Sequence, residues 1–134
     1  MTGITALLLY VIWTIILALS YAGPRVPQVL AGSKSANHWE RGKASDDAPL
    51  LQRAKSAHLN SLENLPLFAA LVLIAAVTQQ NAVVDSLAGI VIAARVGQGI
   101  VHMIGTSFIL VLLRATLFLT QLAIMLYLAF ALMG

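Results

Sequence analysis

The chain has 134 residues, of which 60% are hydrophobic and only 10% are charged. Soluble domains carry about 25% charged residues, so this composition excludes an ordinary globular domain and indicates an integral membrane protein. The formal charge of +3 does not indicate nucleic-acid binding, because most basic residues gather in one loop, as they do at a membrane surface. The chain has no cysteine, which excludes disulfides, thiolate metal sites and cysteine nucleophiles.

Four apolar segments predict four membrane-spanning helices. In chain order these helices cover about residues 4–22, 59–78, 83–103 and 107–133. Each is close to the roughly 20 residues that a helix needs to cross a bilayer, where every backbone group must be bonded within its own segment. The first segment lacks a positively charged start and is long enough to span, so we expect a retained helix rather than a cleaved signal peptide.

The connections between these helices predict their directions. Residues 23–57 form a long polar loop that carries six of the eight Lys and Arg residues. The positive-inside rule places this loop in the cytoplasm. Short turns at residues 78–81 and 105–106 make consecutive helices antiparallel. We therefore predict one domain over residues 1–134, an all-α up-down four-helix bundle in the membrane, and expect a bacterial inner membrane as its location.

Four charged residues lie inside the predicted spans. Asp85 stands at the start of the third span, where we expect it at the outer interface. The other three are Glu63, Arg95 and Arg114. With the predicted directions, they come from three different helices at a similar depth in the inner half of the membrane. An unpaired charge in hydrocarbon costs about 3 kcal/mol or more, so we expect a shared polar pocket in which Glu63 pairs with an arginine. One carboxylate against two guanidiniums leaves this pocket positive, which favours an anionic ligand.

Uncharged polar residues share the level of these charges. A spacing of three residues places Asn60 on the same helical face as Glu63. Spacings of three and four place Gln98 and His102 in one stripe with Arg95. The predicted pocket therefore combines charged and neutral hydrogen-bonding groups.

A structural interpretation stands beside this functional one. A Glu–Arg pair can simply hold two helices together, and Arg114 can extend towards the inner interface. His58 can orient the entry of the second spanning helix instead of binding a ligand. The three His residues lack the spacing of a metal site, so no metal is expected. Gly97 and Gly99 indicate close helix packing rather than a phosphate-binding loop.

The segment RAKSAHLNSLENLP, residues 53–66, resembles the second-helix signature of the MAPEG family, the membrane-associated proteins in eicosanoid and glutathione metabolism. The segments ARVGQGIVH and LLRATLFLTQL resemble the third and fourth helices of that family. The resemblance covers nearly the whole chain. Within the family, the chain resembles a bacterial member of the microsomal glutathione transferase type. It implies a homotrimer of four-helix protomers, with a glutathione site between neighbouring subunits that opens to the cytosol.

The resemblance also implies a role for each matching residue. Asn60 and Glu63 would contact glutathione, and Arg95 would brace Glu63. Arg114 is the candidate catalytic residue, because a guanidinium beside the thiol favours the reactive thiolate. The ligand-binding residues expected on these grounds are Arg53 at the mouth of the site, His58, Asn60, Glu63, Arg95, Gln98 and His102.

Some positions depart from the family pattern. Members often carry His and Tyr where this chain has Gln98 and His102, and the prostaglandin synthase branch has hydroxyls near the positions of Ala115 and Phe118. Prostaglandin synthesis is therefore not expected. The expected function is a glutathione-dependent transferase or peroxidase in the membrane, with glutathione as cosubstrate, that acts on lipophilic electrophiles or lipid hydroperoxides.

Two alternatives remain open. The chain could form a non-catalytic trimer that binds a membrane lipid or another anionic ligand in the equivalent pocket. A small transporter is the weaker alternative, because the outer half of the predicted bundle has almost no polar side chains to form a route.

Overall fold

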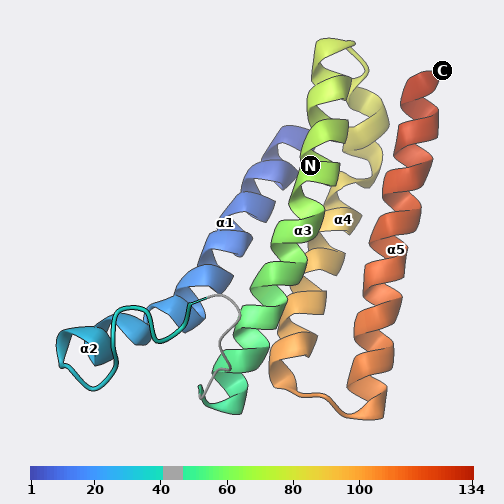
Figure 1. The fold of residues 1–134 in the computed structure, drawn as a ribbon. Helices are drawn as coiled ribbons and strands as arrows, with labels where there is room; N and C mark the ends of the chain where they lie inside the picture. Colours follow the sequence, from blue (N-terminus) through green and yellow to red (C-terminus); the bar gives the residue numbers. More distant parts are fainter. Residues whose placement is uncertain (41–46) are drawn as a thin grey trace.

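The computed structural model describes residues 1–40 and 47–134, and these residues form five helices. In chain order they are α1 (Gly3–Ala22), α2 (Arg25–Leu30), α3 (Pro49–Val77), α4 (Asn81–Ile104) and α5 (Phe108–Met133) (Figure 1). The stretch Gly3–Leu30 and the helices α3, α4 and α5 are each long and apolar enough to cross a membrane. The predicted helical class and its four spanning segments are thus confirmed.

Short polar residues and a proline set several helix ends. The hydroxyls of Thr2 and Ser107 accept hydrogen bonds from backbone N–H groups in the first turns of α1 and α5. α3 begins with Pro49, whose missing N–H leaves no hydrogen bond unmade in a first turn. After α3, Gln79 adopts a left-handed conformation with φ of 59° in the turn that reverses the chain into α4.

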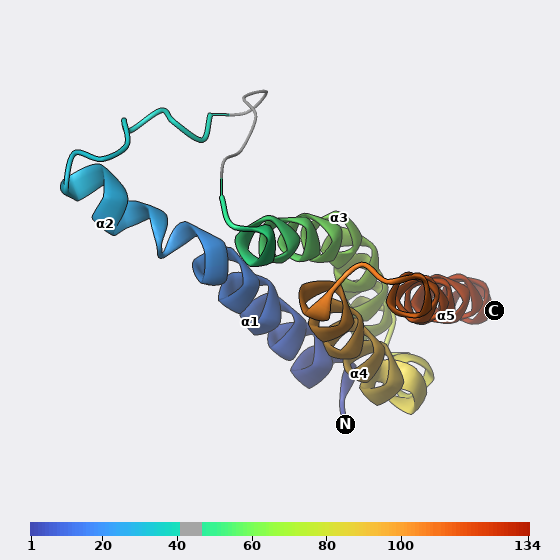
Figure 2. The same ribbon diagram turned by 90° about the horizontal axis from the view of Figure 1, so that it is seen from below.

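The four long helices run alternately in opposite directions (Figure 1). α1 and α5 lie on opposite sides of α3 and α4 (Figure 2), and no contact between α1 and α5 is found in the described part of the chain. The arrangement is therefore an open bundle with α3 and α4 at its centre. We call the end that carries α2 and residues 105–107 the loop end; both chain termini lie towards the opposite end.

The structure corrects the predicted loop over residues 23–57. Residues 25–30 form α2, and α3 begins at Pro49 instead of near residue 59. Polar side chains lower the mean hydropathy of the first turns of α3 and hide them from a search for apolar segments. Ala54 and Ala57 are nevertheless buried there, so packing extends the helix beyond its apolar part. Part of the predicted loop, residues 41–46, lies outside the described residues.

The packed interior lies mainly among α1, α3 and α4. The rings of Tyr10 and Phe68 stack there with centroids 5.9 Å apart. α4 approaches α1 closely at Gly99, where an added Cβ would lie 2.8 Å from Cζ2 of Trp13. At Gly97 the nearest atom would be Cδ1 of Leu117 at 3.7 Å, which is an ordinary contact. The predicted close approach is therefore confirmed at Gly99 and is not required at Gly97.

Candidate functional site

A polar hollow lies between α3, α4 and α5 towards the loop end. Its volume is about 270 Å³. Its lining residues are Asn60, Gln98, His102, Arg114, Ala115 and Phe118. Three of the long helices therefore contribute to it, and four of its lining residues were predicted as site residues from the sequence.

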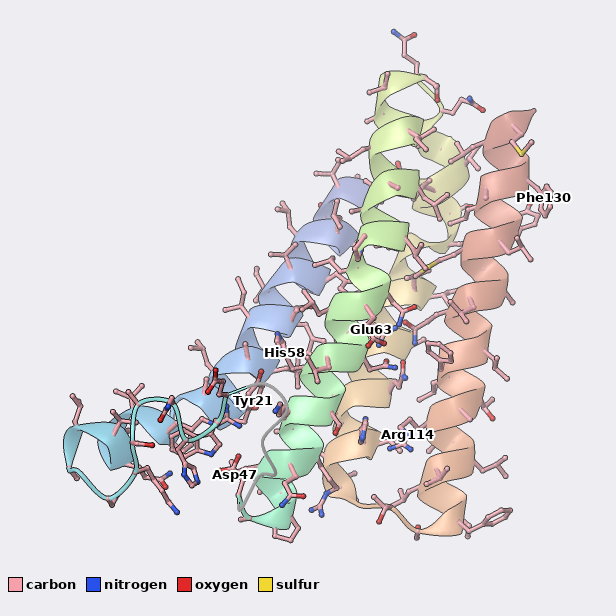
Figure 3. All side chains as sticks on the ribbon, in the orientation of Figure 1. Tyr21, Asp47, His58, Glu63, Arg114 and Phe130 are labelled. Atoms are coloured by element: carbon pink, nitrogen blue, oxygen red, sulfur yellow. The ribbon has the colours of Figure 1, made fainter. Side chains whose placement is uncertain are left out.

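A second hollow of about 410 Å³ adjoins the first nearer the loop end. Its lining residues are Pro49, Gln52, Arg53, Ser56, His102, Thr106 and Arg114. Both hollows share His102 and Arg114, so we treat them as one site and call it the α3–α5 hollow. Figure 3 shows Arg114 extending from α5 towards α4.

The α3–α5 hollow is positively charged. Arg53 and Arg114 line it, and none of its lining residues in the described part of the chain is Asp or Glu. Arg53 is held in place by a hydrogen bond of 3.0 Å from its Nε to the carbonyl oxygen of Met103 at the end of α4. Two guanidiniums without a carboxylate in the same hollow favour an anionic ligand, because a guanidinium offers a planar pair of donors to carboxylate or phosphate.

Arg95 lies beside this hollow but does not line it. Its side chain is only 2% exposed, and its guanidinium carbon lies 5.3 Å from the ring centroid of Tyr10 on α1. Its Nη1 donates to Oδ1 of Asn60 at 2.7 Å. The same oxygen accepts a second hydrogen bond of 3.0 Å from Nε2 of Gln98. The charge of Arg95 is therefore placed against an aromatic face and an amide oxygen inside the bundle.

The predicted ion pair between Glu63 and an arginine is not found in the described protomer. Arg95 contacts Asn60 instead, and an ion pair of 3.0 Å joins Arg25 and Asp47 elsewhere in the protomer. Glu63 is exposed and projects from α3 on the side where α5 lies (Figure 3). A spacing of three residues brought Glu63 and Asn60 to one face but could not decide which of them meets Arg95.

The structure separates His58 from the other predicted site residues. Its Nδ1 lies 2.9 Å from the hydroxyl oxygen of Tyr21 on α1, and the two ring centroids are 5.5 Å apart. Figure 3 shows His58 and Tyr21 close together between α1 and α3. His58 therefore faces α1 and lines neither part of the α3–α5 hollow.

Sequence reasoning missed a fully buried residue of this region. Gln121 on α5 has no exposed surface, and its Nε2 donates to Oε1 of Gln98 at 2.9 Å. The sequence signal was available, because Gln121 is the one amide side chain in the last apolar segment. A buried hydrogen bond of 2.8 Å between Thr14 and Ser61 also joins α1 to α3 and was not expected.

A larger hollow of about 620 Å³ lies elsewhere, around α2 and Trp39. Its cation, Arg25, already forms an ion pair with Asp47 and lies over the rings of Tyr21 and Trp39, with centroid distances of 5.0 and 4.9 Å. The same carboxylate accepts a hydrogen bond from Nε1 of Trp39 at 3.0 Å. Because this charge is satisfied within the chain, the α3–α5 hollow is the better candidate for an anionic ligand.

Comparison with protein-family models matches residues 3–134 to the model of the MAPEG family. No curated protein and no solved structure matches the chain. The family match covers all four spanning segments, including the three helices that line the α3–α5 hollow.

Proposed function

Since this chain belongs to the MAPEG family, we propose that it is a membrane-bound, glutathione-dependent transferase or peroxidase that acts on lipophilic electrophiles or lipid hydroperoxides. The family match and the four apolar helices make the chain an integral membrane protein. The observation that carries the proposal is the positive α3–α5 hollow, in which Arg53 and Arg114 meet polar groups from α3 and α4. Its two adjoining parts, about 270 and 410 Å³, together reach the size of a small-ligand site.

Glutathione fits the chemistry of this hollow. It carries two carboxylates, which Arg53 and the amide of Asn60 would bind, and one thiol. Arg114 would stabilise the thiolate, because a nearby positive charge lowers the free energy of the anion relative to the thiol. His102 lies between the two parts of the hollow and would contact the bound peptide.

The proposed chemistry follows from the thiolate. In conjugation, the sulfur forms a bond to an electrophilic carbon, and the leaving group departs with the bonding electron pair. In peroxide reduction, the sulfur attacks the terminal oxygen of the hydroperoxide, the O–O bond breaks, and the alkoxide takes a proton to become an alcohol. The thiol of a second glutathione then attacks the sulfur of the resulting sulfenic acid, giving the disulfide and water. The apolar substrate would reach the hollow from the membrane.

The assembly and orientation belong to the same proposal. We propose a homotrimer with the loop end in the cytoplasm of a bacterial inner membrane, which the basic residues near that end support. In such a trimer the exposed Glu63 would meet a neighbouring subunit or the ligand, instead of remaining against lipid. His58, which faces α1, would then act on the site only indirectly.

Glutathione binding and turnover test the proposal directly. Calorimetry with purified protein should show binding of glutathione and of S-methylglutathione, and chlorodinitrobenzene should be conjugated above the uncatalysed rate. Arg114→Gln should weaken binding of glutathione more than that of S-methylglutathione, because only the former can present a thiolate to the arginine. Lys55→Gln removes one positive charge near the same end without changing a lining residue and serves as the control. Absence of both binding and turnover in the wild-type protein would reject the proposal.

A second function is favoured by one feature of the hollow. Ala115 and Phe118 line it and supply no hydroxyl group, so it offers fewer donors to a developing negative charge. Under this alternative the protein binds an anionic lipid in the α3–α5 hollow and catalyses nothing. Phospholipid that copurifies with the protein and is not displaced by glutathione would decide for this alternative.

A further inference from the structure

Three amide side chains connect α5 to the buried arginine of α4. Gln121 donates from Nε2 to Oε1 of Gln98 at 2.9 Å, and Gln98 donates from Nε2 to Oδ1 of Asn60 at 3.0 Å. Arg95 donates from Nη1 to the same Oδ1 at 2.7 Å. Gln121 is fully buried, and Gln98 and Arg95 are only 3% and 2% exposed. The chain of hydrogen bonds therefore runs inside the bundle from α5 to α4 and on to Asn60 of α3, where Arg95 of α4 also donates.

The direction of this chain follows from donor chemistry. A guanidinium has donors only, so the Asn60 atom that faces Arg95 must be its oxygen. Gln98 must then present its NH₂ group to that oxygen and its own oxygen to α5, where only a donor can meet it. Gln121 supplies this donor, and its Nε2 also donates to the carbonyl oxygen of Leu117 at 3.0 Å. The orientation of all three amides is thus consistent and does not depend on telling nitrogen from oxygen in a side-chain amide.

These contacts fix which end of the Asn60 amide is left for a ligand. Its Oδ1 is occupied by two donors, while its Nδ2 forms no hydrogen bond to the described residues. Asn60 is one of the residues that line the α3–α5 hollow. Its remaining hydrogen-bonding capacity is therefore two N–H donors at the edge of that hollow, which suit a carboxylate or carbonyl oxygen of a ligand.

We propose that Gln121 is a positioning residue: acting through Gln98, it keeps the NH₂ group of Asn60 available to the hollow and so selects a ligand that presents an oxygen acceptor there. Gln121 gives the buried oxygen of Gln98 its partner. Without it, Gln98 must leave that oxygen unpaired, or rotate and set it against the oxygen of Asn60. Either outcome costs free energy inside the membrane and loosens Asn60. This inference rests on the proposed function only for the identity of the acceptor.

Gln121→Met tests the inference, because methionine keeps the size of glutamine and removes its donors. We expect the Kd for glutathione to rise roughly tenfold, the equivalent of about one hydrogen bond, with kcat at saturating glutathione within about twofold of wild type. Binding of S-methylglutathione should weaken by the same factor, because this compound keeps the carboxylates of glutathione. Gln28→Met on α2 is the matched control and should change neither constant. If Gln121 only holds helices together, the melting temperature falls and both constants stay unchanged, and the inference is rejected.

Asn60→Asp keeps the inference testable if Gln121→Met does not fold. An aspartate accepts from Arg95 and Gln98 as the asparagine does, but it turns a carboxylate oxygen towards the hollow in place of the NH₂ group. We expect the melting temperature to stay at or above that of the wild type, while glutathione affinity falls at least tenfold. Unchanged affinity in Asn60→Asp would overturn the inference.

NMR of isotope-labelled side-chain amides separates this inference from the proposed function. In Gln121→Met, the NH₂ resonances of Asn60 should shift in the absence of any ligand. If the wild-type protein does not bind glutathione but these resonances shift, the proposed function is rejected and the positioning role stands. If glutathione binds and neither the resonances nor the Kd respond to Gln121→Met, only the positioning role is rejected.

Discussion

The contact between α1 and α4 at Gly99 gives a prediction whose size follows from three distances. A Cβ at this position would lie 2.8 Å from Cζ2, 3.0 Å from Nε1 and 3.1 Å from Cε2 of Trp13. All three are shorter than the roughly 3.5–4.0 Å at which such atoms attract each other. The contacting atoms belong to a rigid indole, so it cannot bend away as the end of a flexible side chain can. In Gly99→Ala the two helices must therefore move apart by about 0.5–1 Å.

The expected loss of stability comes from comparing Gly99→Ala with Gly97→Ala. Both substitutions add one methyl group to the same helix, so the gain in helix propensity, about 1 kcal/mol, is common to them. At Gly97 the new Cβ would meet Cδ1 of Leu117 at 3.7 Å, which requires no movement. Overpacking a tight interior costs about 1–3 kcal/mol. Gly99→Ala should therefore be about 1–3 kcal/mol less stable than Gly97→Ala.

Unfolding by a denaturing detergent, followed by circular dichroism, measures this difference. Trp13→Leu removes the indole and should restore most of the loss when combined with Gly99→Ala, because leucine leaves room for the methyl group. Equal stabilities of the two alanine variants would refute the reasoning. So would a loss in Gly99→Ala that persists after Trp13→Leu, since the cost would then not arise from the indole.

Three further predictions concern polar contacts outside the α3–α5 hollow. The carboxylate of Asp85 accepts a 2.6 Å hydrogen bond from the first backbone N–H of α1, so Asp85→Ala should cost about 1 kcal/mol of unfolding free energy, while the adjacent Ser86→Ala should be neutral. Thr14→Val leaves the buried hydroxyl of Ser61 without its 2.8 Å partner and should cost about 1 kcal/mol of unfolding free energy. Adding Ser61→Ala should largely recover this loss, whereas additive losses would show that the two hydroxyls do not interact. His58→Phe should lower the melting temperature but leave the Kd for glutathione within about twofold, because His58 faces α1; a tenfold rise would place it in the site after all.

The sequence was sufficient to predict the spans and much of the candidate site. Long apolar segments must be helical in a bilayer, and the predicted depth of the polar residues grouped Asn60, Gln98, His102 and Arg114. These four residues line one hollow in the structure. Glu63 and Arg95, which were expected in the same pocket, do not line it.

Other features depended on packing that local patterns do not contain. The first turns of α3 are too polar to read as a spanning helix, although Ala54 and Ala57 bury one side of them. Within the described protomer Arg95 donates to Asn60, and the expected contact with Glu63 is not found there. The spacing of residues in the sequence shows which of them share one face of a helix. Which residue on that face contacts a neighbouring helix depends on how that neighbour is rotated.

Arg95 and Arg114 illustrate how one residue type serves two purposes in this bundle. Arg95 is enclosed, and its charge is directed at an amide oxygen and an aromatic ring, so it is not free to bind a ligand and instead orients Asn60. Arg114 is only half-buried and lines both parts of the hollow. A bound anion should therefore interact electrostatically mainly with Arg114, while Arg95 acts through its hydrogen bond to Asn60. Arg114→Lys should then keep a large part of the affinity for the anion, because a cation remains in the hollow. Arg95→Lys should lose that affinity together with the orientation of Asn60. The ammonium group of lysine, on a shorter side chain and without the planar guanidinium, cannot reproduce the contacts of Arg95. Comparable affinities in the two variants would show that this division of roles is wrong.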